Sequence, residues 1–379
     1  MARLGDVCTV VSGSTPKTNI PAYWDGDIKW ITPAELNENS FYIFDSQRHI
    51  TELGKEKTGL SYMPVGTVIL SSRAPIGKTA IAGCELCCNQ GFKNLICSDA
   101  IFNEYLYFFL KSKTDYLNSL GRGATFKEIS KSIVENIEIR LPSLEEQKKA
   151  AKQLGHIYYL ISLRKQQLAK LDELVKARFV ELFGDRNDPQ IELIDLIIDG
   201  AGLSYGIVQP GEDGTGDMGV LRPVDMVDGK IATTSIKYID RSIGDGFKKT
   251  ELTGDELLIT VRGTTGITAL TDERFKKMNV TRGIAVVRYD RNKINPVYLN
   301  AFLNADESQR YIQEHTRGAT LQQINLSDLR VQKIIVPPME LQERFAAFAE
   351  QSDKSKLTVQ QSLDKLEILK KALMQKYFG

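Results

Sequence analysis

The sequence predicts an α+β protein in which two globular α/β-type segments alternate with two long helices. The main observation is a repeat, because the block 120–184 recurs without a gap as 315–379, with an Arg-Gly-Ala-Thr motif near its start and Phe-Gly at its end. The later part of each copy lacks Pro and keeps an apolar stripe at heptad spacing, which is typical of a coiled coil. Unrelated segments would not align over this length, so we interpret the chain as a tandem duplication.

The first globular segment, residues 1–143, begins with a short element at 4–11 and a loop at 12–17. Strands are expected where short apolar runs are bounded by Gly, Pro or polar turn residues, at 28–31, 67–71, 79–82 and 93–97. A helix is expected at 103–120, with an apolar side formed by Tyr105, Leu106, Phe109 and Leu110.

The first long helix is expected over 144–184, with Ser143 as its N-cap and a Glu at the third helical position. Its apolar stripe consists of Leu154, Ile157, Ile161, Leu168, Leu171, Val175 and Leu182. A helix from about 145 to 183 would be roughly 58 Å long, so we interpret it as a spacer.

The second globular segment, residues 185–338, repeats the order of elements in the first, and a second long helix follows over 339–379. The stripe of this helix consists of Phe345, Phe348, Val359, Leu363, Leu366, Leu369 and Leu373. Because the second helix would bring the chain back, the two helices should form an antiparallel coiled coil with approximate two-fold symmetry.

Composition limits the classes of function. The 379 residues carry 49 Lys and Arg against 48 Asp and Glu, so bulk charge gives no support to nucleic-acid binding. A DNA-binding chain of this composition needs local clusters of basic residues, or a partner that supplies phosphate contacts. No apolar run approaches the length of a membrane span and no secretion signal is present, so a cytoplasmic protein is expected.

The five cysteines all lie in the first segment. An odd number argues against a disulfide framework. The Cys84-x-x-Cys87 spacing, followed by Cys88 and Cys97, leaves a zinc site open, but no His lies among them, which favours buried reduced thiols. No metal site is therefore expected.

Taken in order, a set of short motifs resembles the specificity subunit of type I restriction-modification systems. The motifs are Ser12–Pro16, Trp30–Pro33, Ser72–Gly77, the two Arg-Gly-Ala-Thr strings, Leu141–Gln147 and Ser204–Gly211. The resemblance covers the full chain. It implies two target recognition domains, 1–143 and 185–338, each reading one half of a bipartite asymmetric DNA target and held apart by the paired helices.

The resemblance also implies partners and the absence of catalysis. In this family the helices dock two methyltransferase subunits, and restriction/translocase subunits join the larger complex. The resemblance implies no catalytic residue and no cofactor in this chain, with S-adenosylmethionine held by the methyltransferase partner. A self-contained adenine-N6 DNA methyltransferase with its own recognition domains is the alternative.

Two motifs have a second interpretation. Ser72–Thr79 ends in Gly-Lys-Thr like a phosphate-binding P-loop, but Pro75 removes a backbone N–H and Ile267 replaces the Lys in the second copy, so a strand-turn-strand loop is favoured. Asn295–Tyr298 resembles the Asn-Pro-Pro-Tyr loop of adenine-N6 methyltransferases. A helix start with Pro at its first position, matching 103–105, is the favoured alternative.

Candidate DNA-binding residues are basic, polar or aromatic side chains of the loops and of the repeated motif. They are Lys17, Arg73, Lys78, Arg122, Thr125, Tyr205, Gln209, Arg222, Arg262, Arg317 and Thr320. Arg73 and Arg262 occupy matching positions after a strand with no acid shortly after them, so we expect both to face DNA. The Arg-Gly-Ala-Thr strings could bind phosphate, or their Gly could simply end a helix, and the sequence leaves both roles open.

Overall fold

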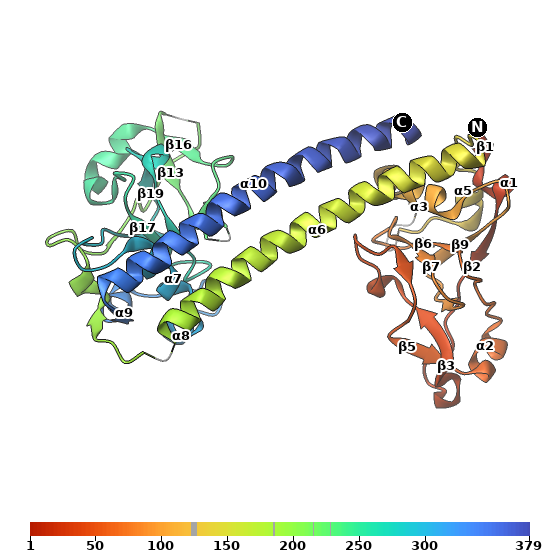
Figure 1. The fold of residues 1–379 in the computed structure, drawn as a ribbon, viewed down its shortest axis with the longest axis horizontal. Coiled ribbons are helices and arrows are strands. Elements are labelled where there is room, and N and C mark those ends of the chain that lie inside the picture. The colour runs from red at the N-terminus through yellow and green to blue at the C-terminus, as the bar shows by residue number, and fades with distance from the viewer. Residues whose placement is uncertain (123–126, 185, 215, 228) are drawn as a thin grey trace. The chain divides into compact units, whose positions relative to one another are not determined.

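The computed structural model describes residues 1–122, 127–184, 186–214, 216–227 and 229–379 (Figure 1). The chain divides into two compact units, Met1–Gln167 with Val359–Gly379, and Leu168–Thr358. Each unit therefore contains one globular segment and part of each long helix, α6 (Leu144–Phe183) and α10 (Met339–Phe378). Within the described residues, no helix combines the length and apolar character that crossing a membrane requires.

The first unit contains a five-stranded sheet of order β2-β9-β6-β7-β4 and a three-stranded sheet of order β5-β3-β8. In the larger sheet β6 pairs antiparallel with both β9 and β7, and in the smaller one β3 runs parallel to β8. The elements are β1 (Ala2–Arg3), α1 (Leu4–Val7), β2 (Cys8–Ser12), η1 (Pro21–Tyr23), β3 (Trp24–Ile31), η2 (Pro33–Glu35), β4 (Tyr42–Ile43), β5 (Arg48–Ile50), α2 (Glu52–Thr58), β6 (Val68–Ser71), β7 (Thr79–Ala82), β8 (Cys87–Cys88), β9 (Phe92–Cys97), α3 (Asn103–Ser112), α4 (Thr114–Leu120), α5 (Lys131–Glu135) and β10 (Glu138–Ile139).

The core of the first unit lies between the larger sheet and α3 (Figure 1). All four residues of β6 are buried, which explains why its first three, Val68 to Leu70, form an apolar run rather than alternating with polar residues. The end of α10 completes this core, since the ring centroids of Tyr105 and Phe378 are 5.0 Å apart. Lys113 also donates to the Phe378 carbonyl at 2.6 Å.

The second unit repeats this plan, with a four-stranded sheet of order β12-β20-β17-β18 and a three-stranded sheet of order β16-β13-β19. Its strand β13 runs parallel to β19, as β3 does to β8. The elements are β11 (Gln190–Glu192), η3 (Leu193–Leu196), β12 (Ser204–Tyr205), β13 (Met218–Leu221), η4 (Pro223–Asp225), β14 (Met226–Val227), β15 (Lys230–Ile231), β16 (Lys237–Ile239), η5 (Arg241–Thr250), β17 (Leu257–Thr260), β18 (Thr268–Leu270), η6 (Glu273–Phe275), β19 (Asn279–Val280), β20 (Ile284–Val287), α7 (Pro296–Asn304), α8 (Asp306–His315), α9 (Leu326–Arg330) and β21 (Lys333–Ile335).

The two long helices begin and end close to the predicted residues, and their length and stripe fit a coiled coil. The predicted cap of α6 is confirmed, because Ser143 Oγ accepts from Glu146 N at 3.3 Å and the Glu146 carboxylate accepts from Ser143 N at 3.0 Å. Most stripe residues are buried or half-buried. Leu369 is an exception with 45% exposure, so its assignment to the packed stripe was wrong.

Within each unit the two helix segments run antiparallel. In the first, Tyr377 donates to Gln153 and the Lys370 ammonium lies 5.4 Å from the Tyr158 ring, so later residues of α6 meet earlier residues of α10. In the second, an ion pair of 2.6 Å joins Asp172 and Lys356, and the ring centroids of Phe179 and Phe345 are 5.4 Å apart, so the same antiparallel order holds.

Some predicted boundaries in the first unit are wrong. The helix expected at 103–120 is two helices, α3 and α4, because Lys113 leaves helical geometry with φ −106° and ψ 16°. The bend brings α4 onto the core, where Leu117 is fully buried and Asn118 Nδ2 donates to Ile76 O at 3.0 Å. The element expected at 4–11 is a single helical turn, α1, followed by the strand β2.

Candidate nucleic-acid interface

The loop motifs of the first segment come together at one end of the five-stranded sheet. Ser14 N donates to Cys88 O at 2.9 Å, and a backbone hydrogen bond of 2.7 Å joins the loop after β6 to the loop before β9. Lys78 Nζ donates to Pro33 O at 3.2 Å, which adds the loop after β3. The first loop cluster, as we call it, consists of residues 12–17, 32–35, 72–78, 89–91, 122 and 127–128.

The second unit builds an equivalent cluster. Ile207 N donates to Val280 O at 2.8 Å, as Ser14 does in the first unit, and Val261 N donates to Gly283 O at 2.8 Å. The second loop cluster consists of residues 204–211, 222–225, 261–266, 281–283 and 317–323. The same backbone frame thus carries different side chains in the two units.

A close crossing of two backbones explains one glycine in each cluster. A Cβ at Gly13 would lie 1.9 Å from the Asn89 carbonyl oxygen, and a Cβ at Gly206 would lie 1.8 Å from the Val280 carbonyl oxygen. No side chain fits at either distance, so both positions require glycine.

Two arginines flank a central residue in each loop cluster. The central residue forms antiparallel bridges with both arginines, and directly opposed residues of antiparallel segments point to the same face. The three side chains of each set therefore form a row. The first arginine row is Arg73, Glu128 and Arg122, and the second is Arg262, Gln323 and Arg317.

The central carboxylate of the first row holds two cations. Glu128 Oε2 lies 2.9 Å from Arg73 Nε, and Oε1 lies 3.1 Å from Nζ of Lys93, a buried lysine that is 6% exposed. Burial raises the pKa of Glu128, but hydrogen bonds from Arg73 and Lys93 outweigh this effect and hold that pKa below its usual value. The carboxylate thus compensates the charge of a buried ammonium.

Four of the predicted DNA-binding cations are engaged by the protein itself, and one of them is Arg317, whose Nη2 lies 3.8 Å from Asp328 Oδ2. Arg73 has an acidic partner, which corrects the expectation of none, because Glu128 lies 55 residues away in the chain. Lys78 donates to a backbone carbonyl of the neighbouring loop. Arg222 Nη2 lies 3.0 Å from Oδ1 of Asp225, whose side chain is fully buried. Lys78 and Arg222 therefore fasten the loops in which they lie.

The other candidates divide into exposed and half-buried side chains. Arg262 is half-buried, and the exposed ones are Lys17, Arg122, Gln209 and Thr320, while Arg317 is exposed although it is paired. Tyr205 lies on the short strand β12 rather than in the expected loop, although it remains 38% exposed. Thr125 lies outside the described residues.

The structure decides between the two interpretations of the Gly-Lys-Thr motif. Residues 72–78 connect the strands β6 and β7, whereas a P-loop connects a strand to a helix. The predicted strand-turn-strand loop is confirmed.

The motif at Asn295 is a helix start, as favoured from the sequence. Asn295 Oδ1 accepts from Val297 N at 2.9 Å, and Pro296 is the first residue of α7. The Tyr298 ring is fully buried and its hydroxyl donates to Ile335 O at 2.7 Å. A ring with no exposed face cannot stack on an extruded adenine, so this motif gives no support to a methyltransferase site.

The cysteines are free thiols, and three of the five are buried. Among the residues that the structure describes, no group of three or more His, Cys, Asp or Glu side chains could hold a metal ion.

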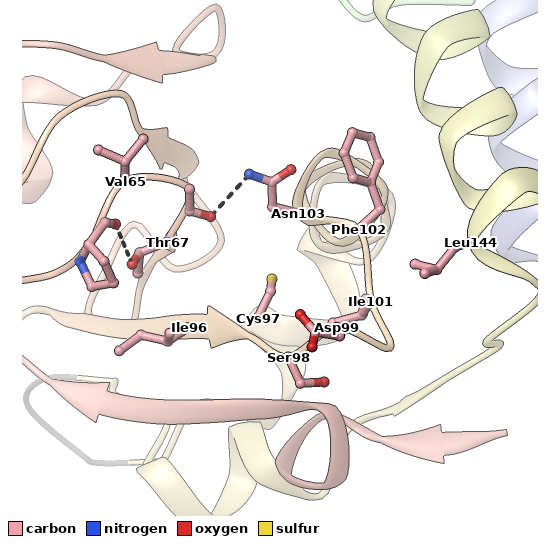
Figure 2. Close-up of a pocket in the computed structure, with 12 residues that line it drawn as sticks. Val65, Thr67, Ile96, Cys97, Ser98, Asp99, Ile101, Phe102, Asn103 and Leu144 are labelled. Atoms are coloured by element: carbon pink, nitrogen blue, oxygen red, sulfur yellow. Dashed lines mark hydrogen bonds between the residues drawn. The ribbon is translucent and has the colours of Figure 1, made fainter.

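Cys97 lines a pocket of the first unit between residues 64–67, 96–99 and 101–103, where Asn103 Nδ2 donates to Gly66 O at 3.2 Å (Figure 2). None of the predicted DNA-binding residues lines this pocket.

Comparison with known proteins gives a consistent result. The model of the type I restriction modification DNA specificity domain matches residues 1–173 and again residues 216–368. The MjaIX specificity subunit of Methanocaldococcus jannaschii is 42% identical over 186 residues, 48% of this chain and 43% of that protein. The EcoBI specificity subunit of Escherichia coli is 21% identical over 312 residues, 74% of this chain and 66% of that protein. The alignments thus span less than two thirds of either relative.

Solved structures share the fold. The S subunit of a type I restriction-modification system from M. genitalium superposes with a TM-score of 0.61 at 14% identity, covering all of this chain and 95% of that one. A chain from a structure describing complex assembly and conformational transition of the type I R-M system gives a TM-score of 0.59 at 19% identity, covering all of this chain and 96% of that one.

Proposed function

The chain belongs to the family of type I restriction modification DNA specificity domains, and from this premise we propose that it is the DNA sequence-recognition subunit of a type I restriction-modification complex. Each unit reads one half of a bipartite, asymmetric target. The observation that carries this proposal is the pair of equivalent loop clusters, which have one backbone frame and different side chains. Bases are read by side chains, so different side chains on the same backbone frame would let the two units read two different half-sites.

The long helices set the spacing between the half-sites and dock two methyltransferase subunits. A 40-residue helix is about 60 Å long, somewhat more than one turn of DNA at ~34 Å. The chain itself is non-catalytic and binds no cofactor. S-adenosylmethionine is held by the methyltransferase subunits, and restriction/translocase subunits complete the complex.

The spacer role is tested by deleting one heptad from each long helix. A heptad deletion keeps the apolar stripe in register and shortens each helix by about 10 Å, or roughly three base pairs of DNA rise. Mapping methylated adenines in host DNA before and after the deletion should show the same half-sites at a shorter spacing. An unchanged spacing would contradict the spacer role.

Recognition is tested with the chain assembled with its methyltransferase subunits. Duplexes altered in one half-site at a time should lose affinity, and a change confined to one loop cluster should alter the preference at one half-site only. The lone chain should neither bind S-adenosylmethionine nor methylate DNA. Methyl transfer by the lone chain would instead favour the self-contained methyltransferase.

A further inference from the structure

The two arginine rows carry their acid at different positions. In the first row the central Glu128 pairs with Arg73. In the second row the central residue is the neutral Gln323, and the acid lies on the following helix, α9, where Asp328 Oδ2 is 3.8 Å from Arg317 Nη2. This oxygen is buried and has no hydrogen-bond partner among the described residues. The ion pair with Arg317 therefore compensates the negative charge of Asp328.

The register of the strands shows that the second unit lacks the buried lysine of the first unit as well as its central carboxylate. Leu70 of β6 pairs with Lys93, and Ile259, the equivalent penultimate residue of β17, pairs with Ala285. Ala285 therefore stands where the first unit has its buried lysine. The second unit lacks both the ammonium and the central carboxylate, as expected if each requires the other, because either alone would be an uncompensated charge.

As a result, a different arginine is left without an acid in each row. Across the described ranges, no ion pair engages Arg122 in the first row or Arg262 in the second, whereas Arg73 and Arg317 each face a carboxylate. A guanidinium without an acidic partner presents planar donors that match the oxygens of a phosphate.

We propose that each unit binds one DNA backbone phosphate through a different end of its arginine row, Arg122 in the first unit and Arg262 in the second. Arg73 and Arg317 stay with their carboxylates and hold the loops. The inference rests on the proposed function, since it takes DNA as the ligand. It follows that a loop carrying one of these arginines, if it is transferred from one unit to the other in a chimaera, must be transferred together with the acid of its row, Glu128 or Asp328.

The first test is a salt titration of the full-length chain with a duplex of arbitrary sequence. Arg122→Ala and Arg262→Ala should each weaken binding about tenfold at low salt, as expected for a charged hydrogen bond. Each should also reduce the slope of log affinity against log salt by about 0.9. Arg73→Ala and Arg317→Ala should weaken binding about twofold or less. Equal losses for the two arginines of a row would overturn the inference.

The second test exchanges the acid between the rows. Gln323→Glu places a carboxylate beside Arg262 and should weaken binding as much as Arg262→Ala does. Gln322→Glu is the matched control, since it adds the same charge one residue away on the opposite face. An equal loss in both Glu variants would show a general charge effect and would also overturn the inference.

The reciprocal variant gives the first row the composition of the second. In the Lys93→Ala/Glu128→Gln double variant, Arg73 is free, so a further Arg73→Ala substitution should now cost about tenfold in affinity. No added loss in this background overturns the inference. Sequence preference at both half-sites with no effect of any arginine variant would leave the proposed function intact, whereas arginine effects without sequence preference would contradict the proposed function alone.

Discussion

Gln147 joins the first long helix to its unit through three hydrogen bonds, and their loss should be measurable. Its side chain is fully buried. Oε1 accepts from Phe102 N at 2.8 Å, and Nε2 donates to Pro142 O at 2.9 Å and to Ala100 O at 3.1 Å. Gln147→Met keeps a similar volume but leaves all three backbone partners unsatisfied. At about 1 kcal/mol for each bond, the first unit should lose about 3 kcal/mol of unfolding free energy.

The second unit has the same arrangement with one bond fewer. Gln342 Oε1 accepts from Asn295 N at 2.8 Å, and Nε2 donates to Pro337 O at 2.8 Å. Gln342→Met should therefore cost about 2 kcal/mol, less than the change in the first unit. The order of the two losses is the more decisive part of the prediction, because it follows from the number of bonds alone.

Urea unfolding combined with hydrogen exchange measures each loss separately, since a chain with two units need not unfold in one transition. Protection of the buried β6 amides reports on the first unit and protection of the buried β17 amides on the second, since neither strand bonds to the substituted glutamines. Gln166→Met, an exposed change on the same helix, is the control and should stay within about 0.5 kcal/mol of the unchanged chain. Losses in the reverse order, or no larger than the control, would refute the reasoning.

Three further changes test other parts of the structure. Burial lowers the pKa of Lys111 to about 8, so the unfolded chain binds the extra proton above that pH and stability should rise with pH from about 8 to about 10. Lys111→Met should abolish the part of this increase in unfolding free energy that Lys111 contributes, which is measured from the midpoints of urea unfolding at different pH values. Cys8 and Cys97 oppose each other on β2 and β9, a spacing that suits a disulfide. A peroxide should join these two thiols with loss of two hydrogens, detectable by mass spectrometry and absent in Cys97→Ser. Gly206→Ala should destabilise the second unit by more than about 2 kcal/mol because its Cβ would overlap a backbone oxygen, which the hydrogen exchange above would report.

The sequence predicts those parts of the fold that depend on local pattern. Caps and periodicity place the long helices to within a residue or two, since Ser143 and Glu146 form a capping box whatever the rest of the chain does. The bend at Lys113 was not predictable from helix pattern, because it depends on packing that brings α4 onto the core. The ion pair between Arg73 and Glu128 was missed for a similar reason, since only the folded sheet brings these residues together.

Identity between the two copies marks the contacts that fix the long helices to their units as well as the arginines of the loop clusters. Tyr105 and Tyr298 are identical because each hydroxyl donates to a backbone carbonyl beside a long helix, at 3.0 and 2.7 Å. Gln147 and Gln342 are identical for the same reason. Identity alone therefore does not separate a structural contact from a binding position. The functional difference lies where the frame is shared and the side chains differ, and the exchange of Glu for Gln at the centre of the arginine rows is visible in the repeat itself once the structure shows which positions face each other.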